Sequence, residues 1–250
     1  MTVSTFWLII VAWVAIAAVA FIVLLRVRAP YGRYTQSGWG PTMDHRLGWF
    51  LMELPALLVF AWFVLSGSNP MSIATWIFFA AWQIHYVHRT LVFPFRMAPG
   101  SKRMPLAIVG SAIFFNSVNG FLNGYYLGSL GPSYDLAWIS DWRFVVGATL
   151  FVVGLVINLQ SDGILLRLRR SGRYEIPQGA LFNLVSCPNY LGEIVEWIGF
   201  ALMTWSPAAA AFAMWTAANL IPRALSNHRW YYERFSEYPP GRKALIPYLV

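Results

Sequence analysis

Charged side chains are scarce in this sequence. Asp, Glu, Lys and Arg make up 11% of its 250 residues, whereas a typical soluble domain carries about 25%. So few charges cannot cover a surface that faces water, and apolar residues of the AVILMFWYC set instead reach 58%. High hydrophobicity with little charge also excludes an intrinsically disordered chain. We therefore expect an integral membrane protein.

Cysteine is nearly absent as well. The one cysteine, Cys187, excludes both a disulfide framework and a zinc site built from cysteines. The glycine-rich signatures of nucleotide-binding folds are also missing. His85 and His88 share a helix face, but further ligands at matching spacing are missing, so we expect no metal site. A nucleotide site in this chain would have to be built from helix ends, loop arginines and buried amides.

Long apolar stretches dominate what is present. A transmembrane helix needs roughly 20 apolar residues. Seven stretches approach this length, at residues 6–25, 47–66, 73–93, 106–127, 144–160, 190–205 and 208–225. The first lacks a basic segment and a cleavage site, so we interpret it as a retained span rather than a signal peptide. The sequence predicts an all-α membrane bundle of seven transmembrane helices, forming a single domain over residues 1–250.

The basic residues predict the orientation of this bundle. All but one of the 18 Lys and Arg residues fall on one side of the seven stretches, and the exception is Arg143. The positive-inside rule puts that side and the C-terminus in the cytoplasm, with the N-terminus outside. A bacterial inner membrane and an endoplasmic reticulum membrane both fit. The net charge of +8 then needs no nucleic acid, and the basic loops either contact anionic lipid or form a pocket for a polyanion such as a nucleotide.

Ionisable residues inside the apolar stretches are the strongest functional signal. Each costs about 2.5–3.5 kcal/mol to insert and usually faces a cavity or a partner. Glu53, two residues before Pro55, either lines a cavity or pairs with an arginine of a neighbouring helix. Tyr86 and Arg89 share one helix face, although Arg89 also lies close enough to the membrane surface to extend towards it.

Amides and carboxylates continue this pattern in the later stretches. Asn116, Asn119 and Asn123 accompany glycines, and helix packing explains them as well as a polar lining does. Asn158 and Asp162 share a face, and Asp162 could also cap the helix or pair with Arg167 or Arg169. Asn189, Glu193 and Glu196 form a polar stripe that binds either a ligand or the arginines of the inner loops. These residues predict a polar, cytoplasm-facing cavity.

Several ordered motifs resemble the steroid 5α-reductase family. They are residues 31–32, 53–55, 85–90, 123–126, 158–162, 174–179, 189–197, 223–225, 228–231, 237–239 and 242–247. The resemblance covers nearly the whole chain and is most specific after about residue 155. It implies NADPH-dependent reduction of the Δ4 double bond of a 3-oxosteroid, by hydride transfer to the β-carbon of the enone.

The resemblance also implies roles for individual residues. Glu53 and Tyr86 would act as catalytic residues that hydrogen-bond the 3-carbonyl of the substrate. A donor in a water-poor pocket stabilises the negative charge that forms on this oxygen. Glu53 can donate only when protonated, which burial away from cations favours. The implied NADPH-binding residues are Tyr31, Trp49, Arg89, Arg103, Asn158, Asp162, Arg169, Tyr174, Asn189, Glu193, Arg223 and Tyr231.

Some positions depart from the family pattern. Met52 stands before Glu53 where steroid-reducing members carry Gln, Glu175 follows Tyr174 where Arg is common, and Asn227 replaces a His. A reductase of a polyprenoid or of a long-chain enoyl thioester is therefore an alternative. An isoprenylcysteine-type membrane methyltransferase and a small-molecule binding or transport protein are others. For the steroid reductase we expect a hydrophobic 3-oxosteroid substrate, surrounding membrane lipid, no nucleic acid and no obligate protein partner.

Overall fold

The computed structural model describes residues 1–28, 34, 40–97, 103–169 and 174–249, and seven long helices form most of this part of the chain. They are α1 (Val3–Arg26), α2 (His45–Leu65), α3 (Ile73–Val87), α5 (Leu106–Tyr125), α6 (Trp142–Arg169), α7 (Pro188–Thr204) and α8 (Pro207–Arg234). Each of the seven predicted stretches falls on a different one of them.

Shorter elements join the long helices. π-helical turns at His88–Val92 and Tyr126–Leu130 extend α3 and α5, and α4 (Phe93–Arg96) follows the first of them. 3₁₀ turns lie at Leu136–Ser140 and Ala180–Asn183. The strands β1 (Thr42–Asp44) and β2 (Arg103–Pro105) pair antiparallel, with Met43 opposite Met104.

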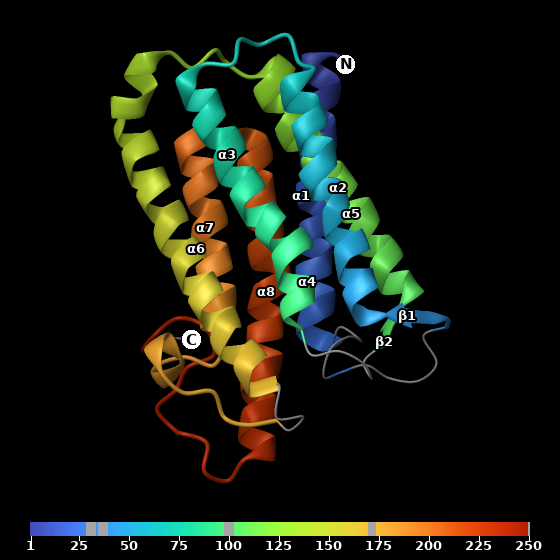
Figure 1. The fold of residues 1–250 in the computed structure, drawn as a ribbon, viewed down its shortest axis with the longest axis vertical. Helices are drawn as coiled ribbons and strands as arrows, with labels where there is room; N and C mark the ends of the chain where they lie inside the picture. Colours follow the sequence, from blue (N-terminus) through green and yellow to red (C-terminus); the bar gives the residue numbers. More distant parts are fainter. Residues whose placement is uncertain (29–33, 35–39, 98–102, 170–173, 250) are drawn as a thin grey trace.

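The long helices run alternately up and down, and the two chain ends lie towards opposite ends of the bundle (Figure 1). Within the described residues, four segments are long and apolar enough to cross a membrane: α1, α2, α5 with its π turn, and α6. The chain is thus a multi-pass membrane protein. By themselves α3 and α7 have 15 and 17 residues, below the roughly 20 of a typical spanning helix, but the π turn and α4 continue α3 as far as Arg96.

Basic residues gather at one end of the bundle. Arg26, Arg96, Arg169 and Arg234 each lie in the last turn of a helix, where a positive charge complements the helix dipole. We call this the basic end. Both α6 and α8 continue well past their predicted apolar stretches, to Arg169 and Arg234. Their last turns are polar, so hydropathy alone did not include them. At the opposite end, Arg143 pairs with Asp141 at 2.7 Å.

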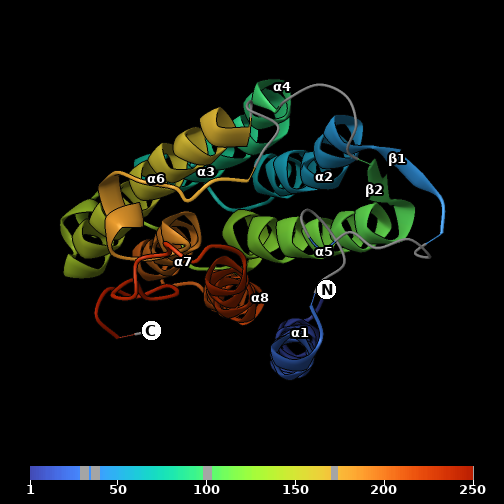
Figure 2. The ribbon, with the colours of Figure 1, turned by 90° about the horizontal axis from the view of Figure 1, so that it is seen from below.

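Glycines bring α6 and α7 into backbone contact. Gly147 and Gly154 of α6 face Gly199 and Gly192 of α7, respectively. Within each helix the two glycines are seven residues apart. A Cβ atom added to Gly154 would lie 2.3 Å from the backbone nitrogen of Glu196. Small residues at such a contact let two helix backbones approach closely. The pair lies side by side in both views (Figures 1 and 2).

A similar contact joins α2 and α5, while aromatic rings fill the centre. A Cβ atom on Gly124 would lie 2.8 Å from the carbonyl oxygen of Phe60. Trp82 stacks on Phe60 at 4.3 Å between centroids and meets Trp197 edge-on at 5.2 Å. Helix α1 lies at the edge of the bundle (Figure 2), where Trp13 packs against Phe115 of α5 at 5.6 Å and its carbonyl accepts from Trp215 of α8 at 2.9 Å.

Candidate functional site

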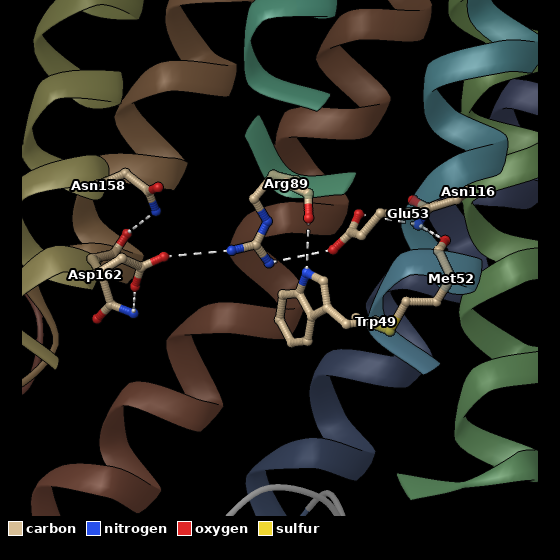
Figure 3. Close-up of polar contacts among 8 residues, drawn as sticks. Trp49, Met52, Glu53, Arg89, Asn116, Asn158 and Asp162 are labelled. Carbon is tan, nitrogen blue, oxygen red and sulfur yellow. Dashed lines mark hydrogen bonds and ion pairs between the residues drawn. The ribbon is translucent and has the colours of Figure 1, made fainter. Parts of the chain in front are cut away.

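A chain of charged side chains crosses the bundle near its basic end. The guanidinium of Arg89 donates to Oε1 of Glu53 on α2 at 3.3 Å and to Oδ2 of Asp162 on α6 at 3.5 Å (Figure 3). All three side chains are largely buried, with 13%, 9% and 7% of their surfaces exposed. Arg89 therefore connects two helices that are far apart in the sequence.

The local chain geometry fixes the position of Arg89. Pro94 lacks a backbone N–H and would clash with the carbonyl four residues earlier, so the helix widens into the π turn that holds Arg89. Phe93 N–H bonds to His88 five residues back. The guanidinium lies over the rings of Trp49 at 4.5 Å and Phe93 at 5.0 Å, and the indole of Trp49 donates to the Arg89 carbonyl at 3.1 Å.

Amides extend the network from Asp162 into α7. The Asn189 side chain donates to Oδ1 of Asp162 at 3.2 Å, and the Asn158 side chain donates to the Asn189 carbonyl at 3.0 Å. The close approach of α6 and α7 makes both contacts possible. Oδ1 of Asn158 is buried and, within the described residues, has no hydrogen-bond partner. It is an acceptor available to a ligand with an N–H group.

On the other side of the network, Asn116 of α5 reaches Glu53. Its amide nitrogen donates to the carbonyl of Met52 at 2.6 Å and lies 3.5 Å from Oε2 of Glu53 (Figure 3). The two oxygens of Glu53 thus face different partners, Arg89 and Asn116. The sequence left Asn116 open between packing and a polar role, and the structure brings it to the predicted catalytic carboxylate.

Tyr86, three residues before Arg89, lies in the aromatic core of the bundle. Its ring is buried and contacts His85, Trp82 and Trp197 at 5.0, 5.0 and 5.8 Å. Nδ1 of His85 lies 2.8 Å from Oε1 of Glu196, and this contact joins α3 to α7. Both His85 and Glu196 stand out in the sequence, but only the fold shows that they are partners.

The structure decides between the interpretations that the sequence left open. Glu53 does pair with an arginine from another helix, so it is not buried away from cations. Asp162 pairs with Arg89 rather than with a base on its own helix. Glu196 contacts a histidine instead of a loop arginine. Among the described residues, Glu193 makes no ion pair, which leaves its predicted ligand role open.

Four predicted cofactor residues lie at the basic end, outside this network. Arg169 and Tyr174 are exposed on either side of the 170–173 segment. Tyr174 meets Trp230 edge-on at 5.2 Å, Arg223 lies 5.1 Å from the ring of Tyr190, and Tyr231 is buried. These residues come from α6, α8 and the connection between α6 and α7. They place cationic and aromatic groups around the end of the α6–α7 pair.

Two further predictions have different outcomes. Arg103 lies in β2 and donates twice to Thr42 at 2.7 Å, so these bonds lie across the β1–β2 strand pair rather than with the other predicted site residues. Tyr31 lies outside the described residues. The cofactor roles of both stay predictions.

A second polar cluster holds the C-terminal segment, which stands out in the sequence only through its family motifs. The hydroxyl of Ser186 lies 2.5 Å from Nδ1 of His228 and 2.6 Å from the hydroxyl of Tyr238. The Ser186 N–H donates to the Lys243 carbonyl at 2.8 Å. Burial lowers the pKa of His228, which lies beyond the apolar stretch of α8, and the nearby charge of Lys243 lowers it further. The cluster ties the chain just before α7 to α8 and the C-terminal segment.

The chemistry of these residues fits a phosphate-bearing nucleotide. Arginines at the basic end can grip phosphate oxygens bidentately, and exposed Arg169 and half-buried Arg223 are accessible for this. Asn158, Asp162 and Asn189 offer both donors and acceptors, as recognition of an amide requires. Within the described residues no group of three or more His, Cys, Asp or Glu side chains is placed to hold a metal.

Comparison with known proteins gives one consistent result. A family profile described as 3-oxo-5-alpha-steroid 4-dehydrogenase matches residues 102–250. The chain is 40% identical to "Steroid 5-alpha-reductase DET2" of Arabidopsis thaliana, over 91% of this chain and 90% of that protein. It is 40% identical to "3-oxo-5-alpha-steroid 4-dehydrogenase 1" of Bos taurus (94% and 93% covered) and 41% identical to that of Homo sapiens (88% and 85%). The chain therefore belongs to the 3-oxo-5-alpha-steroid 4-dehydrogenase family.

Proposed function

We propose that this protein reduces the Δ4 double bond of 3-oxo-Δ4-steroids to give 5α-3-oxosteroids, with NADPH as the reductant. The observation that carries the proposal is the buried Glu53–Arg89–Asp162 chain, because it joins the predicted substrate carboxylate to the predicted cofactor residues. The relatives named as steroid reductases support the same activity, since the chain aligns with them over nearly their whole length. When bound, NADPH supplies the hydride that adds to C5.

Glu53 and Tyr86 carry the electrophilic part of the proposal. Both would donate a hydrogen bond to the C3 carbonyl oxygen, where negative charge accumulates as the enolate forms. Such a donor accelerates the reaction because it binds the transition state more strongly than the ground state. The aromatic core around Tyr86 excludes water, which strengthens this interaction.

Arg89 must release Glu53 before this carboxyl can donate. While Arg89 donates to Oε1 at 3.3 Å, this oxygen acts as an acceptor and is not available to donate to the substrate. Both contacts of Arg89 are longer than the roughly 2.7–2.9 Å of a strong charge-assisted hydrogen bond, so each is weaker than a bond of that kind. An anionic ligand at the basic end would attract the guanidinium away from Glu53 and leave the carboxyl free to take up a proton.

We assign the cofactor to the α6–α7 end of the network. Asn158, Asp162, Asn189 and Glu193 would bind the carboxamide end, and their amides and carboxylates match its donor and acceptor groups. The phosphates would be bound by arginines. The residues proposed for the phosphates and the rest of the nucleotide are Arg89, Arg103, Arg169, Arg223, Tyr31, Trp49, Tyr174 and Tyr231.

We further propose that all seven long helices cross the membrane as one domain, with the basic end in the cytoplasm. The positive-inside rule supports this orientation, since the one Lys or Arg expected at the opposite end is neutralised by Asp141. Cytoplasmic NADPH would then reach the basic end directly, and the steroid would come from the lipid phase.

The direct test uses purified protein in lipid nanodiscs with NADPH and either testosterone or progesterone. We expect the 5α-reduced product, identified by mass spectrometry against a 5β standard. Stabilisation by NADPH without steroid reduction would remove the steroid assignment, and a panel of polyprenoid and long-chain enoyl thioester substrates would then be run. Stabilisation by S-adenosylmethionine in place of NADPH would instead indicate a methyltransferase.

The roles of the two predicted catalytic residues are tested by Glu53→Gln and Tyr86→Phe. Each should lower kcat by about 10²–10³, the usual loss when one electrophilic donor is removed. The dissociation constant of NADPH, measured by nicotinamide fluorescence, should change little in either variant. Normal turnover in both would show that neither side chain polarises the substrate.

A further inference from the structure

Glu53 can serve as a donor only if its two oxygens are held in defined places. Oε1 faces Arg89 at 3.3 Å and Oε2 faces the amide nitrogen of Asn116 at 3.5 Å. These partners come from different helices, the π turn after α3 on one side and α5 on the other. The carboxyl is thus held between two donors, and each donor contacts a different oxygen (Figure 3).

Asn116 is itself firmly placed. Its amide nitrogen donates to the carbonyl of Met52 at 2.6 Å, and only 7% of the residue is exposed. An amide nitrogen carries two hydrogens, so one can bond to Met52 while the other points towards Glu53. Gly120, one turn further along α5, lets this helix approach α2, since a Cβ atom added there would lie 3.2 Å from the backbone nitrogen of Phe60. The contact between Asn116 and Glu53 therefore depends on close packing of two helices.

The consequence concerns where the acidic proton of Glu53 can lie. An N–H group that donates to Oε2 keeps this oxygen as an acceptor, so the proton of the carboxylic acid is directed to Oε1. Oε1 is the oxygen that Arg89 would vacate. A hydrogen bond of 3.5 Å is long, but contacts in catalytic sites often shorten when a substrate binds. Asn116 would then fix both the orientation of Glu53 and the oxygen from which it donates.

We propose that Asn116 is a positioning residue for the reduction, one that orients Glu53 so that Oε1 donates to the carbonyl oxygen of the substrate. This inference rests on the proposed function. It gives α5, a helix without a predicted catalytic or cofactor residue, a defined part in the reaction. It also separates Asn116 from Asn119 and Asn123, which bond to each other within α5 at 3.0 Å.

The test compares three variants in nanodiscs with NADPH and testosterone. Asn116→Leu has a similar shape but no donor, and Asn116→Ser is too short to reach both partners. The matched control is Ser117→Ala, which removes a hydroxyl bonded only to the carbonyl of Ile113 in its own helix. We expect kcat to fall by about 10- to 100-fold in both Asn116 variants, as is typical when a supporting residue is removed. The KM for steroid and the dissociation constant of NADPH should change by less than the loss in kcat, and the control should match the wild type.

A second readout does not depend on turnover. The infrared stretch of a ¹³C-labelled C3 carbonyl, recorded for testosterone bound with NADP⁺, reports how strongly the site polarises the substrate. We expect a lower frequency in the wild type than in Asn116→Leu. Asn116→Gln, which retains the amide, should recover part of the shift and of kcat.

The outcomes separate the two proposals. A wild type that binds NADPH but reduces no steroid would overturn the proposed function. An active wild type with equally active Asn116 variants would overturn only the role of Asn116. Failure of Asn116→Leu and Asn116→Ser to fold, or parallel losses of kcat and NADPH affinity, would make Asn116 a structural residue and also contradict the inference.

Discussion

The two sides of the polar network are held together in different ways. On the α6–α7 side, glycines put backbone against backbone, and short amide side chains then bond across the contact. On the α2 side, the connection to α6 is one long side chain, Arg89, with contacts of 3.3 and 3.5 Å. A packed backbone contact resists change because any added atom meets another backbone. A long side chain with two weak contacts can move. The first side therefore suits a fixed cofactor platform, and the second suits a group that changes partners during the reaction.

The largest effect should come from removing the side chain that bridges the two sides, Arg89. Arg89→Leu leaves the largely buried Glu53 and Asp162 without their cation, and breaking a buried ion pair in this way costs about 3–5 kcal/mol. We expect a lower melting temperature in detergent and no measurable steroid reduction. Arg89→Lys keeps the charge but cannot reach both carboxylates as a planar fork, so it should recover stability more than activity. Equal recovery of both would show that bridging is unimportant.

A smaller effect should follow from forcing apart the rigid side. Gly154→Ala would put a Cβ atom 2.3 Å from the backbone nitrogen of Glu196, and overpacking of this kind costs about 1–3 kcal/mol. The matched control is Gly110→Ala on α5, where nothing lies within 4 Å of the added atom. This control should be neutral or slightly stabilising because Ala favours helices over Gly. Thermal unfolding and NADPH titration measure both, and similar behaviour of the two variants would contradict the close contact.

The smallest expected effect is a pH dependence of stability that arises from His228. It tests whether the well-packed α6–α7 side includes the segment before α7. The pKa of His228 is lowered in the folded protein, so the folded state binds a proton less readily than the unfolded state. Stability is therefore unaffected well above the ordinary value of 6.5 and decreases as the pH falls below it. The groups facing the imidazole are Ser186, Tyr232, Tyr238 and Lys243.

We expect the melting temperature to fall between about pH 7.5 and about pH 5.5 by more in the wild type than in His228→Asn, which cannot titrate. NADPH affinity should also fall with pH if Ser186 and its partners hold the segment before α7 in place. A wild type and variant with identical pH dependence would exclude His228 as the responsible group.

Much of the fold could be predicted from the sequence because hydrophobic segments in a bilayer have few alternatives. Each predicted stretch is a separate long helix, although α6 and α8 run further than hydropathy suggests. The π turn at His88–Val92 was not predicted, although Pro94 was a visible signal for it. The glycine contact between α6 and α7 was also missed, although glycines seven residues apart at 147 and 154 and at 192 and 199 are readable in the sequence.

The sequence identified individual residues of the candidate site, but not which of them contact one another. Scarcity of charge singled out Glu53, Arg89 and Asp162, since an ionisable group in an apolar helix requires a partner. Which partner each one takes depends on how helices from three parts of the chain are arranged. Arg103 shows the limit of transferring roles by motif alone, because its hydrogen bonds lie across the strand pair that β1 and β2 form.

The sequence by itself determined that this is a multi-pass membrane protein with one basic end, and it singled out a few polar residues within the apolar helices. Composition and hydropathy are enough for this because the hydrocarbon core penalises an unpaired charge whichever helix carries it. Only the tertiary structure decided that Arg89 lies between Glu53 and Asp162, that His85 meets Glu196, and that Asn116 reaches the second oxygen of Glu53. These contacts join residues 36 to 111 positions apart, and no local pattern specifies contacts over such distances.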